Sequence, residues 1–389
     1  MIPDGHGPGH ARTLFVTNDF PPRPGGIQAF VHALALRRPP GSVVVYASRW
    51  RGWEEFDARQ PYRVVRHAGS LMLPVPEVAR RAAALVRSEG CDTVVFGAAA
   101  PLGLLAPALR AAGARRVVML THGHEAAWAG VPVARGLLAR IGARADVVTY
   151  LGEYTRERLV RVVPSGRLVR LTPGVDTGVF RPGSGGAGVR ASLGIGERPV
   201  VVCVSRLVPR KGQDTLVRCW PSVLREVPDA VLLLVGGGPS RPAIERAIGE
   251  RGLAGSVVVT GSVPWSSLPA YYDAGDVFAM PCRTRLGGMD VEGLGIVYLE
   301  ASATGLPIVA GASGGAPDAV LPGETGLVVD GRDPAEVAAA LTGLLRDPER
   351  ARRMGERGRE WIEREWRWDL VAERFAELLD GSGSPTART

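Results

Sequence analysis

Residues 200–212 read Val-Val-Val-Cys-Val-Ser-Arg-Leu-Val-Pro-Arg-Lys-Gly, an apolar run that passes directly into a loop with three cationic side chains. An apolar run without a polar face is typical of a strand covered on both sides, as in a parallel sheet. The segment beyond Gly212 favours a helix. Residues 200–212 therefore predict a strand, a cationic loop and the start of a helix.

Lys211 is the single lysine among 47 basic residues, and every other one is arginine. Lysine is a compact point charge on a flexible stem, whereas arginine is a planar fork, so lysine suits one phosphate oxygen in a tight pocket. The position therefore indicates phosphate binding. A lysine on a solvated loop is the alternative.

The pattern of short β-branched runs and longer alanine-, leucine- and arginine-rich segments extends along the chain, and predicts parallel sheets covered by helices. A turn-rich segment at residues 172–186 interrupts the pattern and is interpreted as a linker. We expect strands at 13–17, 43–46, 93–96, 117–120 and 147–150, and then at 200–204, 230–235, 256–259, 277–279, 307–309 and 326–329.

Two Rossmann-like α/β domains are the simplest assembly of these elements. We expect a disordered tail at 1–12, an N-terminal domain at 13–175 and a C-terminal domain at 176–365. Consecutive helices are predicted at 334–345, 348–364 and 368–379. The helix within 366–380 is expected to complete the N-terminal domain.

The formal net charge of +8 and pI near 9.8 indicate an anionic partner, although a general preference for arginine explains much of the excess. Aromatic residues are 6% and scattered singly, which argues against nucleic-acid binding. Cys91, Cys203, Cys219 and Cys282 are widely spaced and are interpreted as core residues in a reducing compartment. We expect no membrane span and no secretory signal.

Two motifs follow strands of the first half. Gly25 and Gly26 precede a helix, where backbone N–H groups can approach an anion. His122 and His124 follow the strand at 117–120, at the edge where α/β sheets place ligands. For either ring, a structural loop histidine is the alternative, and a metal is disfavoured because no further ligand cluster lies nearby.

The segment 290–300 reads Asp-Val-Glu-Gly-Leu-Gly-Ile-Val-Tyr-Leu-Glu and gives the strongest signal in the chain. Glu292 and Glu300 are eight residues apart, a little over two helical turns, so both carboxylates are expected to address one extended ligand. The amides of Gly293, Leu294 and Gly295 are expected to open a helix toward an anion. The pattern favours a sugar nucleotide.

Two weaker loops are expected at the same edge of the second sheet. One is 236–239, and the other is 261–264, where the backbone of Val263 is expected to meet a nucleobase edge.

These motifs together resemble the retaining glycosyltransferases of family 4, which have the GT-B fold. The segments 17–23, 121–125, 281–285 and 290–299 are similar to actinobacterial GDP-mannose-dependent members that mannosylate phosphatidyl-myo-inositol monomannoside. The resemblance extends from about residue 12 to about residue 380. It implies two Rossmann-like domains facing a central cleft, with a last helix that crosses back to the N-terminal domain.

The resemblance also implies roles for single residues. Arg206 and Lys211 would neutralise the donor diphosphate. Glu292 would hold the mannose C3 and C4 hydroxyls, and Glu300 the ribose. His122, or less favourably His124, would lie near the sugar C6. Gly25 and Gly26 would close over the phosphates.

The implied reaction moves mannose from GDP-mannose to a phosphatidylinositol mannoside through an α-1,6 linkage. No Asp-x-Asp pair is present, so we expect no metal and no cofactor. The acceptor is expected to be an anionic phosphoinositide-type lipid at the cytoplasmic face of the membrane, touched peripherally through 71–76 with Arg80 and Arg81. A core turn at 71–76, a related transferase with another donor or acceptor, a phosphorylase and a GT-B epimerase are the alternatives.

Overall fold

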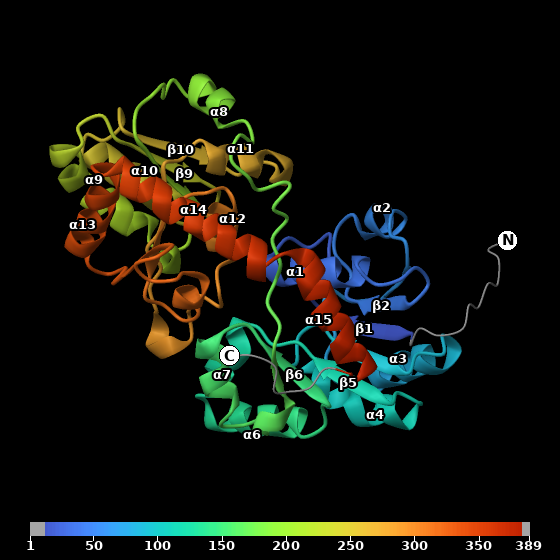
Figure 1. Cartoon of the computed structure of the whole chain (residues 1–389). Helices are drawn as coiled ribbons and strands as arrows, with labels where there is room; N and C mark the ends of the chain where they lie inside the picture. The colour runs from blue at the N-terminus through green and yellow to red at the C-terminus, as the bar shows by residue number, and fades with distance from the viewer. Residues whose placement is uncertain (1–11, 383–389) are drawn as a thin grey trace. The chain divides into compact units, whose positions relative to one another are not determined.

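The computed structural model describes residues 12–382, with the side chains of residues 124, 126 and 127 excepted. The tail predicted at 1–12 therefore lies almost entirely outside the described residues. The chain divides into two compact units (Figure 1). Unit 1 comprises residues up to Leu151, Thr155–Thr172 and the chain from Val371 on, and unit 2 comprises Gly152–Tyr154 and Pro173–Leu370.

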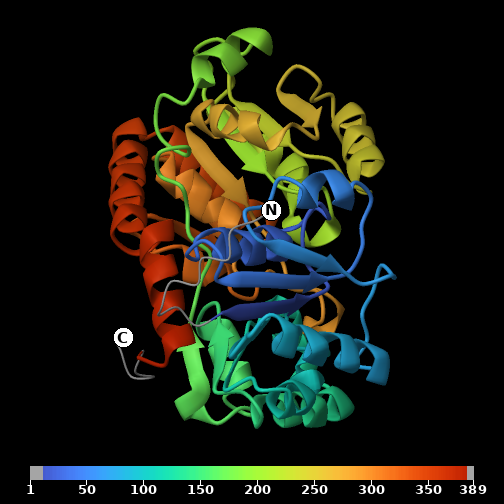
Figure 2. The same ribbon diagram turned by 90° about the vertical axis from the view of Figure 1, so that its right-hand side faces the viewer.

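Unit 1 is built on a parallel sheet in the order β3-β2-β1-β4-β5-β6-β7. The strands lie side by side in Figure 2, in blue to green. Their bounds are β1 Thr13–Thr17, β2 Val43–Ala47, β3 Arg63–Arg66, β4 Thr93–Phe96, β5 Arg116–Met119, β6 Val147–Tyr150 and β7 Leu168–Arg170. The helices of this half are α1 Gly26–Leu36, α2 Trp53–Asp57, α3 Pro76–Ser88, η1 Leu102–Leu105, α4 Ala106–Ala111, α5 Gly123–Trp128, α6 Pro132–Gly142, α7 Glu153–Leu159 and η2 Ser165–Arg167.

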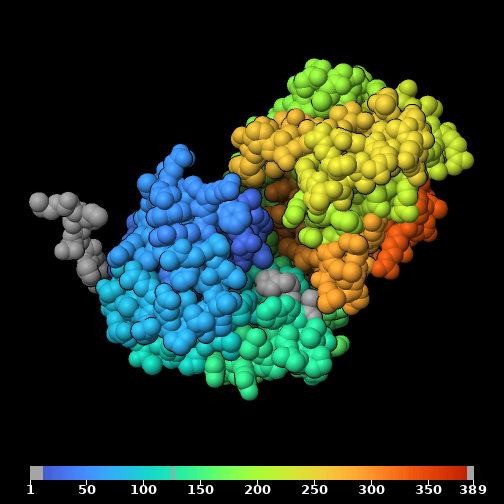
Figure 3. All heavy atoms as spheres, turned by 180° about the vertical axis from the view of Figure 1, so that it is seen from behind, coloured from blue at the N-terminus to red at the C-terminus, as the bar shows by residue number. Residues whose placement is uncertain are grey.

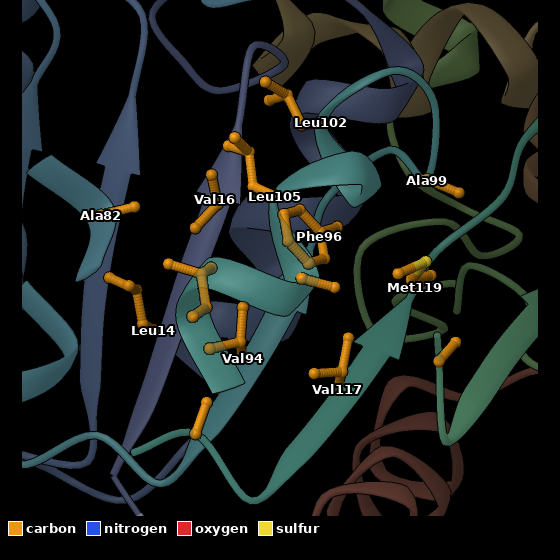
Figure 4. Packing of buried hydrophobic residues seen from close by; sticks show 14 of the residues in the cluster. Leu14, Val16, Ala82, Val94, Phe96, Ala99, Leu102, Leu105, Val117 and Met119 are labelled. Carbon is orange, nitrogen blue, oxygen red and sulfur yellow. The ribbon is translucent and has the colours of Figure 1, made fainter. Parts of the chain in front are cut away.

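Both faces of this sheet are buried because helices cover each of them. Leu14 and Val16 of β1 point into a core with α3, η1 and α4 (Figure 4). Phe15 points to the opposite face, where its ring centroid lies 6.0 Å from that of Phe375. Alternate side chains of one strand thus enter two cores, which explains why the strand has no polar face.

Unit 2 has a second parallel sheet in the order β10-β9-β8-β11-β12-β13. The strands are β8 Val200–Val204, β9 Val231–Val235, β10 Val257–Gly261, β11 Val277–Met280, β12 Ile308–Gly311 and β13 Gly326–Val329. The helices are α8 Gly186–Ser192, η3 Pro209–Lys211, α9 Gln213–Glu226, α10 Arg241–Glu250, η4 Trp265–Ser267, α11 Leu268–Asp273, η5 Leu286–Gly288, α12 Ile296–Ala303, η6 Ala316–Ala319, α13 Pro334–Leu345 and α14 Pro348–Glu365. The segment around α10, in yellow, forms part of the outer surface of this unit (Figure 3).

The C-terminal helices begin where the sequence places Asp-Pro pairs. Asp333 caps α13 by accepting hydrogen bonds from the backbone N–H groups of Ala335 and Glu336, and Asp347 caps α14 through Arg350. In each helix, proline occupies the first position, where no N–H partner is needed. The prediction of three consecutive helices is confirmed.

The last helix, α15 Trp368–Asp380, joins unit 1 from Val371 on. Besides the Phe375 contact, the Arg116 side chain donates from Nε to the backbone oxygen of Leu378 at 2.6 Å. The predicted return of this helix to the N-terminal half is confirmed. The contact boundaries fall after Thr172 and Leu370, whereas the expected ones were 175 and 365.

Strand ends differ from the prediction by one or two residues at β2, β5, β9, β10, β11 and β12. Two strands were not predicted: β3 and β7 are short, carry arginine and lie at or near the edges of their sheet. The predicted linker, 172–186, reaches the start of α8. No helix in the described part of the chain is both long and apolar enough to cross a bilayer.

Candidate active site

In unit 2 the predicted donor-site residues follow strands of one sheet. Because all its strands are parallel, the loops after β8, β9, β10, β11 and β12 meet at the same edge. The carboxyl edge of such a sheet is where α/β folds bind ligands. The loops that carry Lys211, Val263 and Glu292 all begin there.

Lys211 and Glu292 are in direct contact. Lys211 Nζ lies 2.6 Å from Glu292 Oε2, and each side chain is about nine-tenths buried. Gly212 turns the chain into α9 with φ 81°, and a Cβ there would lie 2.0 Å from the backbone oxygen of Pro281. Only glycine fits this close approach, which brings the lysine loop against the segment after β11.

Gln213, the first residue of α9, is hydrogen-bonded to the same loop. Its Nε2 donates to Ser205 Oγ at 2.6 Å and to the backbone oxygen of Arg206 at 3.2 Å. Gln213 is buried, so these bonds are protected from water. Gln213 is not among the residues predicted for the site. A buried polar residue directly after the Lys-Gly pair was the available signal.

The predicted geometry of Glu292 was wrong in one respect. Helix α12 starts at Ile296, so Glu292 lies in the loop before the helix, and its distance from Glu300 is not a matter of helical turns. A second glycine loop holds it instead: Gly315 N–H donates to the backbone oxygen of Glu292 at 2.9 Å. A Cβ on Gly314 would lie 2.0 Å from that oxygen. The Gly-Gly pair after β12 was also missed.

Glu300 is buried within α12, where its Oε2 accepts a hydrogen bond from the Tyr272 hydroxyl at 2.7 Å. Burial raises the pKa of Glu300 to about 7, and the hydrogen bond from Tyr272 opposes part of this rise. Near neutral pH this carboxyl group can therefore act as a donor or an acceptor toward a ligand hydroxyl.

Gly293, Leu294 and Gly295 immediately precede α12, as predicted. Gly295 has φ 84°, and a Cβ there would lie 2.6 Å from the ring of Tyr298. Tyr298 is itself fixed, because its hydroxyl donates to the backbone oxygen of Met280 at 2.6 Å. The turn before α12 is thus packed against β11.

Arg206 and Val263 lie apart from the contact between Lys211 and Glu292. The Arg206 side chain is exposed and makes no ion pair within residues 12–382. Val263 is half-buried after β10 and lines a hollow of about 350 Å³ together with Gly185 and Tyr271. Both belong to the same sheet edge as Lys211, but neither joins the Lys211–Glu292 contact.

In unit 1, His122 is buried at the end of β5. Its Nε2 lies 2.8 Å from the backbone oxygen of Gly97, which only accepts, so Nε2 carries the hydrogen. The His122 backbone N–H donates to Glu125 Oε2 at 2.7 Å, and the Phe30 ring packs edge-on against the imidazole. The imidazole is therefore held in a single orientation. The alternative residue, His124, has its side chain outside the described residues.

Gly25 and Gly26 also lie in unit 1, at the start of α1. Gly25 has φ 157°, and a Cβ there would lie 2.1 Å from Gln28 Oε1. Gln28 in turn donates to Asp19 Oδ1 at 2.7 Å, which ties the helix start to the loop after β1. Among the described residues, no group of three or more His, Cys, Asp or Glu side chains is arranged to hold a metal.

Two family models match the chain, one on each half. Residues 24–179 match "Glycosyltransferase Family 4", and residues 189–361 match "Glycosyl transferases group 1". A Mycolicibacterium smegmatis relative is 54% identical over 375 residues, which cover 95% of this chain and 98% of the relative. The chain is a family 4 glycosyltransferase.

The relative from Mycolicibacterium smegmatis is named GDP-mannose-dependent alpha-(1-6)-phosphatidylinositol monomannoside mannosyltransferase. A relative of the same name from Mycobacterium tuberculosis is 52% identical over 380 residues, with 95% of this chain and 98% of the relative covered. A Corynebacterium glutamicum enzyme, named for a monoacylated form of the acceptor, is 43% identical over 374 residues, or 95% of this chain and 97% of its own.

A solved structure of Anabaena HepE in complex with UDP resembles this glycosyltransferase with a TM-score of 0.82 at 19% identity. The similarity covers 95% of this chain and 100% of HepE. This likeness, with the two parallel sheets, confirms the predicted GT-B fold.

Proposed function

We propose that this glycosyltransferase moves mannose from GDP-mannose to a phosphatidylinositol monomannoside, forming an α-1,6 linkage with retention of anomeric configuration. The observation that carries the proposal is the identity of 54% along nearly the whole chain with a relative named for this donor and acceptor. The geometry of unit 2 supports it, because a cation, two buried carboxyl groups and a helix start lie at one sheet edge.

The diphosphate of the donor is assigned to Lys211, Arg206 and the N-terminus of α12. Lys211 would exchange Glu292 for a phosphate oxygen, and the exposed side chain of Arg206 is free to follow a ligand. Preorganised cations and backbone N–H groups stabilise a leaving phosphate in a water-poor site. For this reason we also propose that the reaction needs neither a metal nor a cofactor.

The hydroxyl groups of the donor are assigned to the two glutamates. Glu292, freed from Lys211, would accept hydrogen bonds from the mannose C3 and C4 hydroxyls. Glu300 would bind the ribose beside Tyr272, and the backbone of Val263 the nucleobase. Carboxylates form strong hydrogen bonds with hydroxyl donors when both are buried.

Unit 1 would supply the remaining contacts. Gly25 and Gly26 are assigned to the donor phosphates, since the start of α1 favours an anion. His122 is assigned to the sugar near C6, with its hydrogen on Nε2 directed to Gly97 as the structure has it. The ligand would then contact the imidazole at ring atoms other than Nε2.

The lipid acceptor would be reached through a peripheral contact of unit 1 with the cytoplasmic membrane face. Leu71 and Leu73 are 57% and 51% exposed, whereas Met72 between them is fully buried. Asn18 fastens this turn with two hydrogen bonds to the Met72 backbone, of 2.9 and 2.6 Å. The two leucines are held at the surface close in sequence to the exposed arginines of α3, which suits an anionic bilayer.

An assay of the purified chain with radiolabelled GDP-mannose and phosphatidylinositol monomannoside tests the proposal. We expect label in the lipid extract at the mobility of the dimannoside, an α-1,6 linkage by NMR, and full activity in EDTA. Preference for a UDP-sugar, or a strict need for added magnesium or manganese, would contradict it. A modified sugar nucleotide formed without lipid would identify an epimerase instead.

A further inference from the structure

Arg210 lies between two carboxylates and is hydrogen-bonded to neither. Its Nη1 is 3.5 Å from Asp290 Oδ1, and its Nε is 3.7 Å from Glu292 Oε2. That Nε is buried and has no hydrogen-bond partner in the described residues. The guanidinium is thus within ion-pair distance of both carboxylates and is committed to neither.

The backbone of Arg210 is fixed, so a change of partner between Asp290 and Glu292 would involve its side chain alone. Its carbonyl oxygen accepts from the Arg283 N–H at 2.8 Å. Arg283 is anchored in turn, because its Nη2 donates to both oxygens of Asp214 at 2.9 Å. The start of α9 and the segment after β11 thus form one rigid frame around Arg210.

Asp290 is fixed as well. Its backbone N–H and oxygen pair with those of Arg285 in a short antiparallel bridge, at 3.3 and 2.9 Å. Arg285 Nη1 donates to Asp290 Oδ2 at 3.2 Å. This arrangement leaves Oδ1 of the same carboxylate directed at Arg210.

Glu292, unlike Asp290, must change partners in the proposed reaction. This inference rests on that reaction. Lys211 and Arg210 both approach its Oε2. When Lys211 turns to the donor diphosphate, Arg210 becomes the nearest cation to Glu292. A guanidinium bound there would occupy the carboxylate that the sugar hydroxyls need.

We propose that Asp290 is a positioning residue of the donor site. It holds the Arg210 guanidinium off Glu292, so that Glu292 keeps its capacity to accept hydrogen bonds from the sugar. Asp290 would act through Arg210 and would not touch the substrate.

Steady-state kinetics of Asp290→Asn test this role, because the amide has the same shape and no charge. We expect the KM for GDP-mannose to rise on the order of tenfold, with kcat changed by less than about threefold, since a uniform loss of ground-state binding raises KM alone. Affinity for GDP, measured by calorimetry, should stay unchanged because GDP carries no mannose. Arg210→Gln alone should leave KM within about threefold of the parent.

The double variant Asp290→Asn/Arg210→Gln separates positioning from a merely structural role. If Arg210 causes the loss, its removal restores KM to the value of Arg210→Gln. Arg285→Gln is the matched control: it removes the other cation bound to Asp290, but the backbone bridge still holds Asp290, so KM should rise less than in Asp290→Asn. A parent-like KM in Asp290→Asn, no rescue in the double variant, or an equal loss in Arg285→Gln would overturn the proposal.

Glu292→Gln distinguishes failure of this inference from failure of the proposed function. Absence of mannose transfer by the parent chain would contradict the proposed function itself, whereas parent-like turnover in Glu292→Gln would show only that Glu292 does not hold the sugar, and this inference would then fall with that assignment. Impaired Glu292→Gln with a parent-like KM in Asp290→Asn would remove only the role of Asp290.

Discussion

Lys211 Nζ lies 2.6 Å from Glu292 Oε2, with both side chains almost fully buried. In the proposed reaction the lysine binds phosphate and the glutamate binds sugar. Donor binding then replaces one internal ion pair by two ligand contacts. The cost of separating the buried pair is offset only by a ligand that offers an anion and hydroxyl groups together.

Lys211→Ala is expected to lower kcat/KM by roughly a hundred- to a thousandfold, the usual effect of removing one group that stabilises a developing negative charge. Lys211→Arg is also expected to be impaired, because a planar fork replaces a point charge in a closed pocket. Circular dichroism and thermal melting serve as controls for folding, since Lys211→Ala leaves Glu292 without its cation. Parent-like turnover in both variants would exclude a role for the lysine.

Arg206→Ala should lower activity to a similar degree without affecting stability, because its side chain is exposed and makes no ion pair among residues 12–382. If Arg206 and Lys211 serve the same diphosphate, the double variant should lose less than the sum of the two free-energy changes. Kinetics of all four members of this mutant cycle measure the coupling. Strict additivity would mean that the two cations act on separate groups.

Glu292→Gln and Glu300→Ala are expected to fail in opposite ways. The first should reduce transfer sharply and leave GDP affinity nearly unchanged, because GDP has no mannose. The second should weaken GDP binding, since Glu300 is assigned to the ribose. Calorimetry with GDP on both variants decides the matter, and equal affinities would show that the two roles are assigned wrongly.

Glu300 should make the protein less stable as pH rises from about 4.5 to about 7. The unfolded carboxyl group loses its proton near pH 4.5, whereas burial in the folded chain raises the pKa to about 7. Between these values the native state binds more protons, so the free energy of unfolding falls with pH, by about 3 kcal/mol at most. Urea unfolding at pH 5 and pH 7.5 measures the slope. Glu300→Gln should flatten it; an unchanged slope would contradict this assignment.

Arg80→Ser/Arg81→Ser should weaken binding to anionic vesicles and turnover of the lipid acceptor together, with GDP affinity unchanged. Exposed charges are screened within about 8–10 Å at physiological salt, so vesicle binding of the parent should fall steeply as salt rises. Arg246→Ser/Arg251→Ser, on the exposed surface of unit 2, is the matched control. Vesicle sedimentation tests the contact, and equal binding to neutral and anionic vesicles would refute it.

The sequence was sufficient to predict the sheets and the residues at their edge because both depend on local pattern. Val200–Val204 has no polar face and forms β8, buried on both sides. Parallel strands then bring the residues that follow them to one edge, whatever their distance along the chain. This explains why Lys211 and Glu292 could be associated with one ligand before their contact was known.

The remaining features depend on partners that local pattern does not specify. β3 carries an arginine at each end, and the side chain of Arg66 is buried because its guanidinium binds Asp57 and the backbone oxygens of Pro21 and Ser48. Two valines between two arginines give no signal for a buried strand. Tyr272 likewise reaches Glu300 from another helix. Such pairs are decided by tertiary packing.

The return of α15 to unit 1 has a consequence for the order in which the molecule is made. Phe15 emerges from the ribosome long before its ring partner Phe375, because 359 residues lie between them. Domains generally fold as they are synthesised, but this one lacks part of its hydrophobic core until α15 has been made. Most of unit 2 is synthesised after unit 1, but all strands of unit 2 precede α15 in the chain. They are therefore available before unit 1 receives its last helix. The half that is synthesised first is therefore completed last.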